Sequence, residues 1–320
     1  MTSLNWVIGA GGLLGSGVVR RLRASGASVF DGPRIAWTGG NAVSELAVGL
    51  AALTEAAQNQ EWRVYWCAGA GVTDSDQRAL RAEVTMFQSF LDAMRLLSAT
   101  TLDQGAIVLA SSAGAVYGGS QEAPFHEYSK TAPLGHYGRA KLAIEQALRE
   151  FSESSGVPSF VGRISNLYGP GQSISKPQGL ISRLCLSSFT RSPISVFVSL
   201  DTLRDYLYID DCAELMISGG SRLRRRKIDN SFHMKVLASG RSVSVGALLS
   251  LFGTVAGRRP NVVMGLSPQA TLQSRDLRLR SRYWVDLDEH STVNLADGIA
   301  RTLQDLRHSF LRANEARLPQ

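Results

Sequence analysis

Cysteine is scarce in this sequence. Cys67, Cys185 and Cys212 lie far apart in 320 residues, and neither they nor the five histidines show the spacing of a metal site. We therefore expect no disulfide framework and no bound metal. Sparse thiols are typical of reduced cytoplasmic proteins, so the sequence predicts a cytoplasmic location.

Long hydrophobic runs are also missing. The longest apolar stretches are short and interrupted by glycine, which predicts no transmembrane helix and no membrane partner. The segment Met1–Leu14 lacks a basic start and leads directly into a strand-like run, so no signal peptide is expected.

Acidic residues are outnumbered by basic ones, 27 to 34, which gives a net charge of +7. Much of the excess lies in two runs, "RLRRRK" (Arg222–Lys227) and "RDLRLRSR" (Arg275–Arg282). No helix-turn-helix, zinc finger or aromatic-interleaved basic motif accompanies them, so nucleic acid is not an expected partner. We interpret the first run as a solvated helix end or loop, and the second as a candidate phosphate contact for a small anionic molecule.

The sequence does contain a regular alternation of strand-like and helix-like segments. Apolar, β-branched strands that alternate with amphipathic helices indicate a parallel sheet covered on both faces. Strands are expected at residues 6–10, 27–30, 63–69, 106–112 and 158–165, and helices at 13–26, 43–57, 77–97 and 138–156.

The pattern loosens after Asn166, where a glycine–proline loop leads into a mixed segment that ends with "RDYLYIDDCAELM". Helices are expected near residues 244–257 and 295–312. We predict an α/β fold, a Rossmann-type doubly wound parallel sheet with a smaller C-terminal α/β substrate domain. The dinucleotide-binding domain would span residues 1–165 with a later contribution from about 200–240; residues 166–320 would be mainly substrate-binding and partly interleaved.

A glycine-rich turn follows the first predicted strand in "VIGAGGLLG". Gly9, Gly12 and Gly15 allow a tight turn, close approach of a pyrophosphate and close helix–strand packing. The helix that begins near Leu13 and Leu14 offers free N–H groups to the phosphates. This placement predicts a bound dinucleotide, NAD or NADP.

The choice between NAD and NADP depends on the residues after the second strand. An acidic residue there would hold the ribose hydroxyls of NAD, but Asp31 comes early for this role, only five residues after Gly26. Two residues further on, Pro33 is followed by Arg34, which could pair with a 2′-phosphate. NADP is therefore slightly favoured, while a plain surface arginine remains the alternative.

Tyr137 and Lys141 lie four residues apart in "HYGRAK", on one face of a predicted helix. A free phenol has a pKa of about 10, so action as a base near neutrality requires stabilisation of the phenolate. The charge of Lys141 supplies part of it. Ser112, at the end of a strand and 25 residues before Tyr137, could donate a hydrogen bond to a substrate oxygen.

Together with their neighbours, these motifs resemble the extended short-chain dehydrogenase/reductase family, in particular the NAD-dependent epimerase/dehydratase type that modifies nucleotide sugars. The resemblance covers almost the whole chain. It rests on "GAGGLLG", "WCAGAG", "SSAGAVYG", "PFHE", "YGRAK", "RISNLYGPGQ" and "RDYLYIDDCA", in this order.

The resemblance implies that Tyr137 is the general acid or base, Lys141 its electrostatic partner and a ligand of the nicotinamide ribose, and Ser112 the substrate hydroxyl contact. It places Ala68, Gly69 and Ala70 along the cofactor. It also implies that Asn166 and Arg204 contact the diphosphate of a nucleotide sugar, with Arg275 or Arg278 as weaker candidates. The alternatives are a loop cap for Asn166 and an ion pair with Asp205 or Asp210 for Arg204.

Two positions depart from the family pattern. The usual hydroxyl position, three residues before Val116, holds Ala113, so Ser112 stands one residue early. The helix position that commonly holds asparagine falls near Glu83, which predicts a different proton relay.

The resemblance also narrows the choice of reaction. The 4,6-dehydratase branch of the family carries an acid pair directly after the catalytic hydroxyl, whereas residues 113–115 here are Ala-Gly-Ala and cannot transfer a proton, so a 4,6-dehydratase and a decarboxylase are disfavoured. The ranking of the remaining reactions rests on overall likeness to the epimerase branch. An epimerase that transiently oxidises a sugar hydroxyl ranks slightly first, and an NADPH-dependent ketoreductase is the alternative. A non-catalytic dinucleotide-binding regulator is a less favoured alternative.

The resemblance also implies a homodimer through the helices near residues 77–97 and 140–151.

Overall fold

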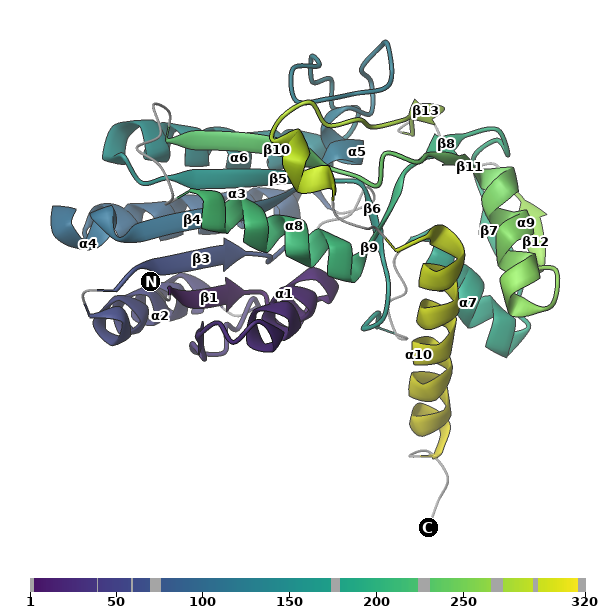
Figure 1. Ribbon diagram of the computed structural model, residues 1–320, viewed down its shortest axis with the longest axis horizontal. Coiled ribbons are helices and arrows are strands. Elements are labelled where there is room, and N and C mark those ends of the chain that lie inside the picture. The colour runs from purple at the N-terminus through teal and green to yellow at the C-terminus, as the bar shows by residue number, and fades with distance from the viewer. Residues whose placement is uncertain are drawn as a thin grey trace.

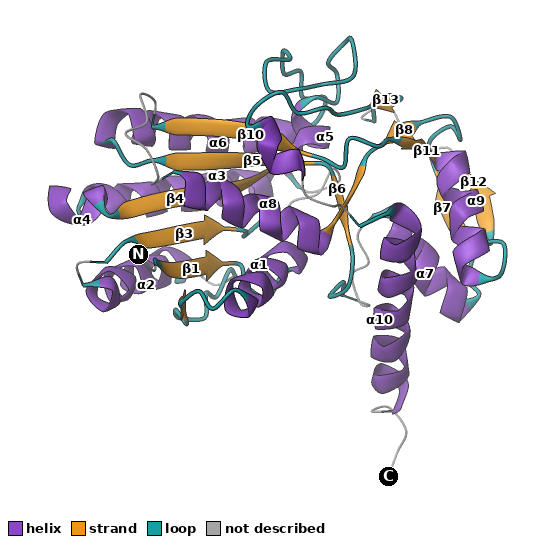
Figure 2. Ribbon diagram, viewed as in Figure 1, coloured by secondary structure: helices purple, strands orange, loops and turns teal. Residues whose placement is uncertain are grey.

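A computed structural model describes residues 3–38, 40–58, 60–69, 76–173, 179–223, 231–265, 273–289 and 293–315. Its centre is a six-stranded sheet in the order β10-β5-β4-β3-β1-β2, in which every neighbouring pair is parallel (Figures 1 and 2). The strands are β1 (Leu4–Ile8), β2 (Val29–Phe30), β3 (Trp62–Trp66), β4 (Gly105–Ser112), β5 (Ser159–Ile164) and β10 (Phe232–Leu237).

Helices cover both faces of this sheet (Figure 1). One face carries α1 (Leu13–Ala24) and α8 (Ile209–Arg222), and the other carries α2 (Ala42–Ala57), α3 (Gln77–Arg95) and α6 (His136–Ser155). Side chains alternate between the faces, so Val7 and Tyr65 belong to the first core and Trp6, Ile8 and Val64 to the second. This alternation explains why the strands read as continuous apolar runs.

A smaller part of the chain lies beyond the carboxyl ends of these strands. Its helices are α7 (Leu180–Thr190), α9 (Val245–Ala256) and α10 (Leu295–Glu315), and α10 packs along α7 and α9. Short strands pair around them: β6 (Asn166–Tyr168) with β9 (Tyr206–Tyr208), β7 (Ile194–Val196) with β12 (Val262–Met264), and β8 (Leu203–Arg204) with β11 (Val243–Ser244) and β13 (Asp276–Leu277). The remaining short helices are α4 (Ala99–Asp103), α5 (Ala113–Val116) and the 3-10 helix η2 (Val285–Glu289).

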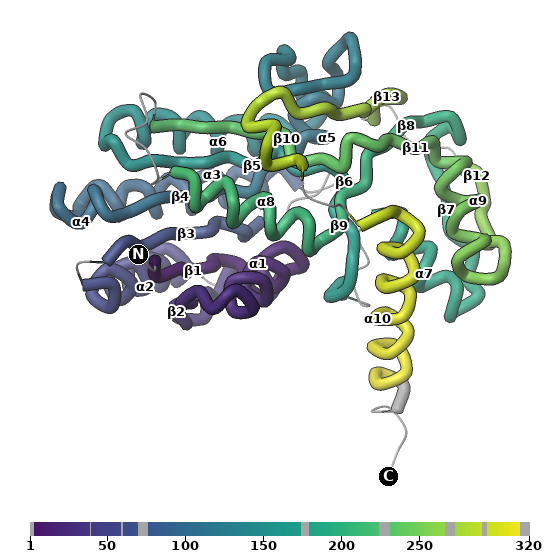
Figure 3. The backbone as a smooth tube through the Cα atoms, in the orientation of Figure 1, coloured from purple at the N-terminus to yellow at the C-terminus, as the bar shows by residue number. Residues whose placement is uncertain are grey.

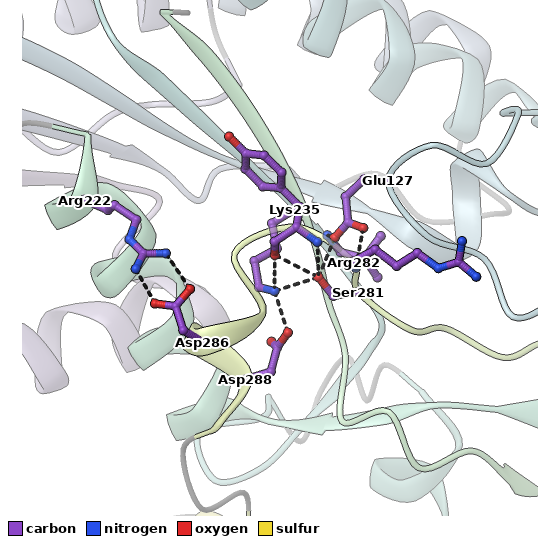
Figure 4. Close-up of polar contacts among 9 residues, drawn as sticks. Glu127, Arg222, Lys235, Ser281, Arg282, Asp286 and Asp288 are labelled. Carbon is purple, nitrogen blue, oxygen red and sulfur yellow. Dashed lines mark hydrogen bonds and ion pairs between the residues drawn. The ribbon is translucent and has the colours of Figure 1, made fainter. Parts of the chain in front are cut away.

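The chain crosses between the two parts more than once. It leaves the sheet after β5, forms β6 to β9, returns as α8 and β10, and leaves again toward β11 and α9 (Figure 3). A buried polar cluster then fastens a late segment to the sheet edge. Lys235 in β10 is fully buried and donates to Ser281 Oγ, the Tyr283 carbonyl and Asp288, while Glu127 accepts from Ser281 Oγ and from two backbone amides (Figure 4).

The expected fold class is confirmed, and the element boundaries move slightly. The helix that carries Tyr137 begins at His136 rather than residue 138, and the second strand contains only Val29 and Phe30. The expected helices near residues 244–257 and 295–312 are α9 and α10. Of the basic run "RLRRRK", Arg222 ends α8 and forms an ion pair with Asp286 (Figure 4), and residues 224–227 lie outside the described residues.

Candidate functional site

The glycine turn joins β1 to α1 and needs glycine at particular positions. Gly9 has a φ of +87°, and a Cβ there would lie 2.7 Å from the amide nitrogen of Ala68. A Cβ on Gly15 would collide with the carbonyl oxygen of Gly9, so this glycine lets α1 pack against the turn. A Cβ on Gly11 would meet nothing within 4 Å. The turn therefore has a packed side and an open side, and the open side fits a pyrophosphate at the N-terminus of α1.

A cavity of about 970 Å³ extends from this turn along the end of β2. Three arginines line it: Arg20, Arg23 and Arg34. Arg20 pairs with Asp210 at 2.6 Å, and Arg23 pairs with Asp31 at 3.0 Å. Arginines thus outnumber acids among the described residues that line the cavity, where Asp31 is the one carboxylate and pairs with Arg23 at the surface.

The register of β2 explains why Asp31 does not lie level with the glycine turn. Trp6 of β1 lies beside Phe30 of β2, so an extension of the same register would bring Gly9 beside Pro33. Asp31 therefore comes two residues before the level of the glycine turn, and Arg34 comes directly after that level. This geometry matches the spacing argument from the sequence and leaves Arg34 beside the cavity.

A second cavity of about 550 Å³ shares Gly11 and Gly12 with the first. It brings together most of the residues that the sequence singled out. Its lining includes Gly12, Leu13, Leu14, Ala68, Gly69, Ser112, Tyr137, Lys141 and Asn166. Ala70 lies outside the described residues. The two cavities together form one continuous candidate site at the carboxyl ends of the strands, where open α/β sheets bind ligands.

Tyr137 and Lys141 lie side by side in the first turns of α6. The ammonium of Lys141 lies 5.6 Å from the centre of the Tyr137 ring and 2.7 Å from Glu83 Oε1 on α3. Burial by itself lowers the pKa of Lys141, but the charges of Tyr137 and Glu83 and the hydrogen bond to Glu83 outweigh burial, so the pKa is raised. Lys141 is therefore held as a cation in the site.

Gly69 makes room for this ion pair. It has a φ of +153°, and a Cβ at this position would lie 2.8 Å from Glu83 Oε1 and 3.0 Å from Lys141 Nζ. The loop after β3 thus passes directly over the Lys141–Glu83 pair. Any larger residue at position 69 would push the pair or the loop away from the cavity.

Two neighbouring serines, Ser111 and Ser112, line the cavity, and they differ in their hydrogen bonds. Ser111 Oγ donates to Glu145 at 2.5 Å, so its proton is engaged. Ser112 Oγ accepts from the Ala115 amide at 3.4 Å, which leaves its own proton available to a ligand. Ala113, at the usual family position of the hydroxyl, is fully buried at the start of α5.

The two proposed diphosphate contacts, Asn166 and Arg204, differ in their position relative to the cavity. Asn166 lines the cavity, and its side-chain amide donates to the Asp205 carbonyl at 2.8 Å. Arg204 is 8% exposed and donates to the Leu203 carbonyl, and burial lowers its pKa. It is not among the described residues that line the cavity.

The two aspartates near Arg204 in the sequence have other partners. Asp205 accepts a hydrogen bond from Ser239, and Asp210 pairs with Arg20, so in the described part of the chain neither forms an ion pair with Arg204. Arg275 is exposed and pairs with Asp201, while Arg278 is exposed and pairs with Asp276 at 2.8 Å. Neither of these two lies among the described residues of the cavity wall.

A buried network beside the site was not expected from the sequence. Arg163 in β5 pairs with Glu145 at 2.6 Å and donates a hydrogen bond to the Tyr117 hydroxyl at 2.7 Å. Glu145 also accepts a hydrogen bond from Ser111 Oγ. The only available signal was an arginine inside the apolar strand "PSFVGRIS", because such a charge must find a partner when buried. The network fixes the end of β4 next to Ser112.

In the described part of the chain, no group of three or more His, Cys, Asp or Glu side chains is arranged to hold a metal ion. Within the same part, no helix combines the length and apolarity needed to cross a membrane.

Comparison with known proteins gives a consistent family. Residues 6–218 match the model of the NAD dependent epimerase/dehydratase family. A dTDP-4-dehydro-6-deoxyglucose reductase of Escherichia coli is 29% identical over 202 residues, which cover 63% of this chain and 61% of that protein. A UDP-glucose 4-epimerase of Azospirillum brasilense is 32% identical over 131 residues, which cover 37% of this chain and 38% of that protein. The matched parts thus span less than two thirds of either relative.

Solved structures share the fold over nearly the whole chain. MoeE5 in complex with UDP-glucose and NAD superposes with a TM-score of 0.77 at 23% identity and covers 96% of this chain and 99% of that one. A UDP-glucose 4-epimerase of Thermotoga maritima with UDP-glucose gives a TM-score of 0.77 at 20% identity, with the same coverage. At these identities the likeness establishes the fold.

Proposed function

The chain belongs to the NAD-dependent epimerase/dehydratase family, and on this basis we propose that it is an NAD(P)-dependent enzyme that exchanges a hydride with a hydroxyl- or keto-bearing carbon of a nucleotide sugar. The observation that carries the proposal is the convergence of Tyr137, Lys141 and Ser112 on one cavity that continues to the glycine turn. Similar proteins whose structures contain UDP-sugars and NAD support the choice of ligands.

The residues of the chain divide the chemistry among them. Ser112 donates a hydrogen bond from its hydroxyl to the sugar oxygen and so orients it. Tyr137 takes the proton of a hydroxyl or gives a proton to a ketone, and Lys141 stabilises the phenolate form. The dinucleotide, when bound, supplies or accepts the hydride. Asn166 at the cavity wall and the buried cation Arg204 are proposed to face the diphosphate.

An epimerase is our first candidate reaction. In this reaction a sugar hydroxyl is oxidised, the keto sugar turns within the cavity, and the hydride returns to the opposite face. The similarity to UDP-glucose 4-epimerases supports this reading. The turn at Ala113, Gly114 and Ala115 carries no acid, which supports leaving out a dehydratase.

A ketoreductase that consumes NADPH is the second candidate. The basic cavity at the end of β2 favours it, because Arg34 is placed for a 2′-phosphate while Asp31 is engaged by Arg23. The similarity to the Escherichia coli reductase supports it as well. A dinucleotide-binding regulator without catalysis would need neither Tyr137 nor Lys141.

We also propose which part of the chain binds the dinucleotide and which part binds the sugar. The dinucleotide would bind residues 1–165, to which a later segment of about residues 200–240 adds β10 of the sheet. The sugar would bind mainly to residues after Asn166.

Two copies of the chain are proposed to pair through α3 and α6. Sedimentation velocity at micromolar concentration would then show the mass of a dimer.

The test combines released cofactor and turnover. Mass spectrometry of the nucleotide that the denatured protein releases is expected to give near-stoichiometric NAD for an epimerase. An empty protein that NADPH stabilises more than NADH indicates the ketoreductase. With a panel of nucleotide sugars and nucleotide keto sugars, Tyr137→Phe is expected to lose at least a hundredfold in turnover. Normal turnover by Tyr137→Phe, or no binding of either cofactor, would refute the proposal.

A further inference from the structure

Lys141 has a counter-ion of its own before any ligand enters the site. Its ammonium lies 2.7 Å from Glu83 Oε1, and the two side chains are 8% and 15% exposed. Glu83 comes from α3, whereas Lys141 and Tyr137 come from α6. The positive charge that should stabilise a Tyr137 phenolate is therefore already balanced by a carboxylate from another helix.

The other groups around Lys141 do not alter this balance. Glu145, one turn further along α6, acts on Lys141 through its charge, but it is paired with Arg163 of β5. Burial raises the pKa of the Cys67 thiol, beyond β3, to about 12, so this thiol stays neutral. Ser111 and Ser112 at the end of β4 carry no charge. Among the described residues around Lys141, Tyr137 is thus the remaining group on which a net charge would appear.

Charge counting then predicts the state of the phenol. The Lys141–Glu83 pair carries no net charge while Tyr137 is protonated. Loss of the phenol proton would leave two negative charges, on Tyr137 and Glu83, beside the single positive charge of Lys141. Like charges near one another disfavour such a state. If Glu83 were neutral, a phenolate would instead be the counter-ion of Lys141.

We propose that Glu83 is a positioning residue that balances the charge of Lys141 and keeps Tyr137 in its proton-donating form until a second cation enters the cavity. The inference rests on the proposed function, in which Tyr137 exchanges a proton with the sugar oxygen. An oxidised nicotinamide is such a cation, whereas a reduced nicotinamide ring carries no charge. Glu83 thereby sets how much of the Lys141 charge is left to favour a Tyr137 phenolate.

The experiment titrates the phenol in the full-length protein without substrate. Ultraviolet absorbance of tyrosinate is recorded against pH for the wild type and for Glu83→Gln, and the curve of the matching Tyr137→Phe background is subtracted from each. The difference isolates Tyr137. Glu83→Gln is expected to move this step to lower pH by about one unit, since removal of a nearby like charge changes a titration by at least this much. Glu83→Asp, which keeps the charge, is expected to move it much less.

The matched control is Asp92→Asn, which removes an exposed carboxylate from the same helix α3. Its titration should coincide with that of the wild type. A Glu83→Gln curve that also coincides with the wild type overturns the proposal, and so does an equal displacement by Asp92→Asn. A purely structural role of Glu83 would lower the melting temperature without moving the titration.

A second measurement applies if Glu83→Gln does not fold. Glu83→Asn removes the same charge with a shorter side chain, and it is titrated against its own Tyr137→Phe background. It is expected to move the Tyr137 step to lower pH as Glu83→Gln would, and a curve that coincides with the wild type contradicts the proposal. Because neither titration uses a sugar substrate, a failure to find turnover would refute the proposed function and leave this test intact.

Discussion

At the scale of single residues, position along the chain separates the two charged groups that could distinguish NAD from NADP. Asp31 follows β2 directly, pairs with Arg23 on the surface at 3.0 Å, and lies two residues before the level of the glycine turn. Arg34 lines the same cavity and comes one residue after that level. A guanidinium recognises a phosphate through paired hydrogen bonds, so Arg34 is the group that would distinguish NADP from NAD.

Substitution of Arg34 tests this assignment. Arg34→Ala is expected to weaken NADPH binding about tenfold, which corresponds to one charge-assisted hydrogen bond, and to leave NADH binding unchanged. Fluorescence titration with each cofactor measures both affinities. Arg95→Ala, which removes an exposed arginine outside the cavity, is the control. Equal NADPH affinity of Arg34→Ala and the wild type would show that Arg34 is a surface residue that does not contribute to NADPH binding.

At the scale of elements, β1, the glycine turn and α1 form one rigid unit. Gly15 allows the first turn of α1 to lie against the Gly9 carbonyl, and Gly9 allows the turn to lie against Ala68 after β3. Gly11 belongs to the same turn but faces open space. The packed glycines therefore serve the fold, and the open one is proposed to face the dinucleotide.

A pair of alanine substitutions separates these two roles. Gly15→Ala is expected to destabilise the protein by about 2 kcal/mol, because the new methyl group collides with backbone that cannot move freely. Gly11→Ala is expected to leave the melting temperature unchanged and to weaken dinucleotide binding at least tenfold. Thermal unfolding and cofactor titration of both variants provide the data. Unchanged cofactor affinity of Gly11→Ala would mean that the pyrophosphate does not lie over the turn.

At the scale of the whole molecule, distant segments meet at the edge of the sheet. Lys235 of β10 binds a segment that lies 46 to 53 residues later in the chain, and Glu127 reaches the same segment from the loop before α6 (Figure 4). Both side chains are almost completely buried. Their pairing joins three parts of the chain that share no local sequence signal.

Removal of the buried lysine tests how much this junction contributes. Lys235→Met leaves three acceptors without their donor and is expected to lower the free energy of unfolding by about 3 kcal/mol. Arg20→Ala breaks an exposed ion pair and is expected to cost less than about 1 kcal/mol. Chemical denaturation of both variants gives the comparison. Similar costs for the two would show that the buried cluster does not hold the late segment in place.

Much of the fold could be predicted because its signals are local. The period of apolar residues depends on the geometry of a single helix or strand, so the parallel sheet and its covering helices were expected from the chain alone. The glycine turn is equally local, since Gly9 and Gly15 have no room for a side chain. The spacing of Tyr137 and Lys141 also fixes their common face within one helix.

Only the tertiary structure decided which polar groups find one another. Glu83 lies 58 residues before Lys141, and no periodicity links them, yet helix packing places their charges 2.7 Å apart. The difference between Ser111 and Ser112 likewise depends on Glu145, 34 residues away from Ser111. The sequence by itself determined the elements and the reactive pair, because both follow from backbone geometry along a few residues. Charge balance around that pair depends on distances between separate elements, which exist only once the chain has folded.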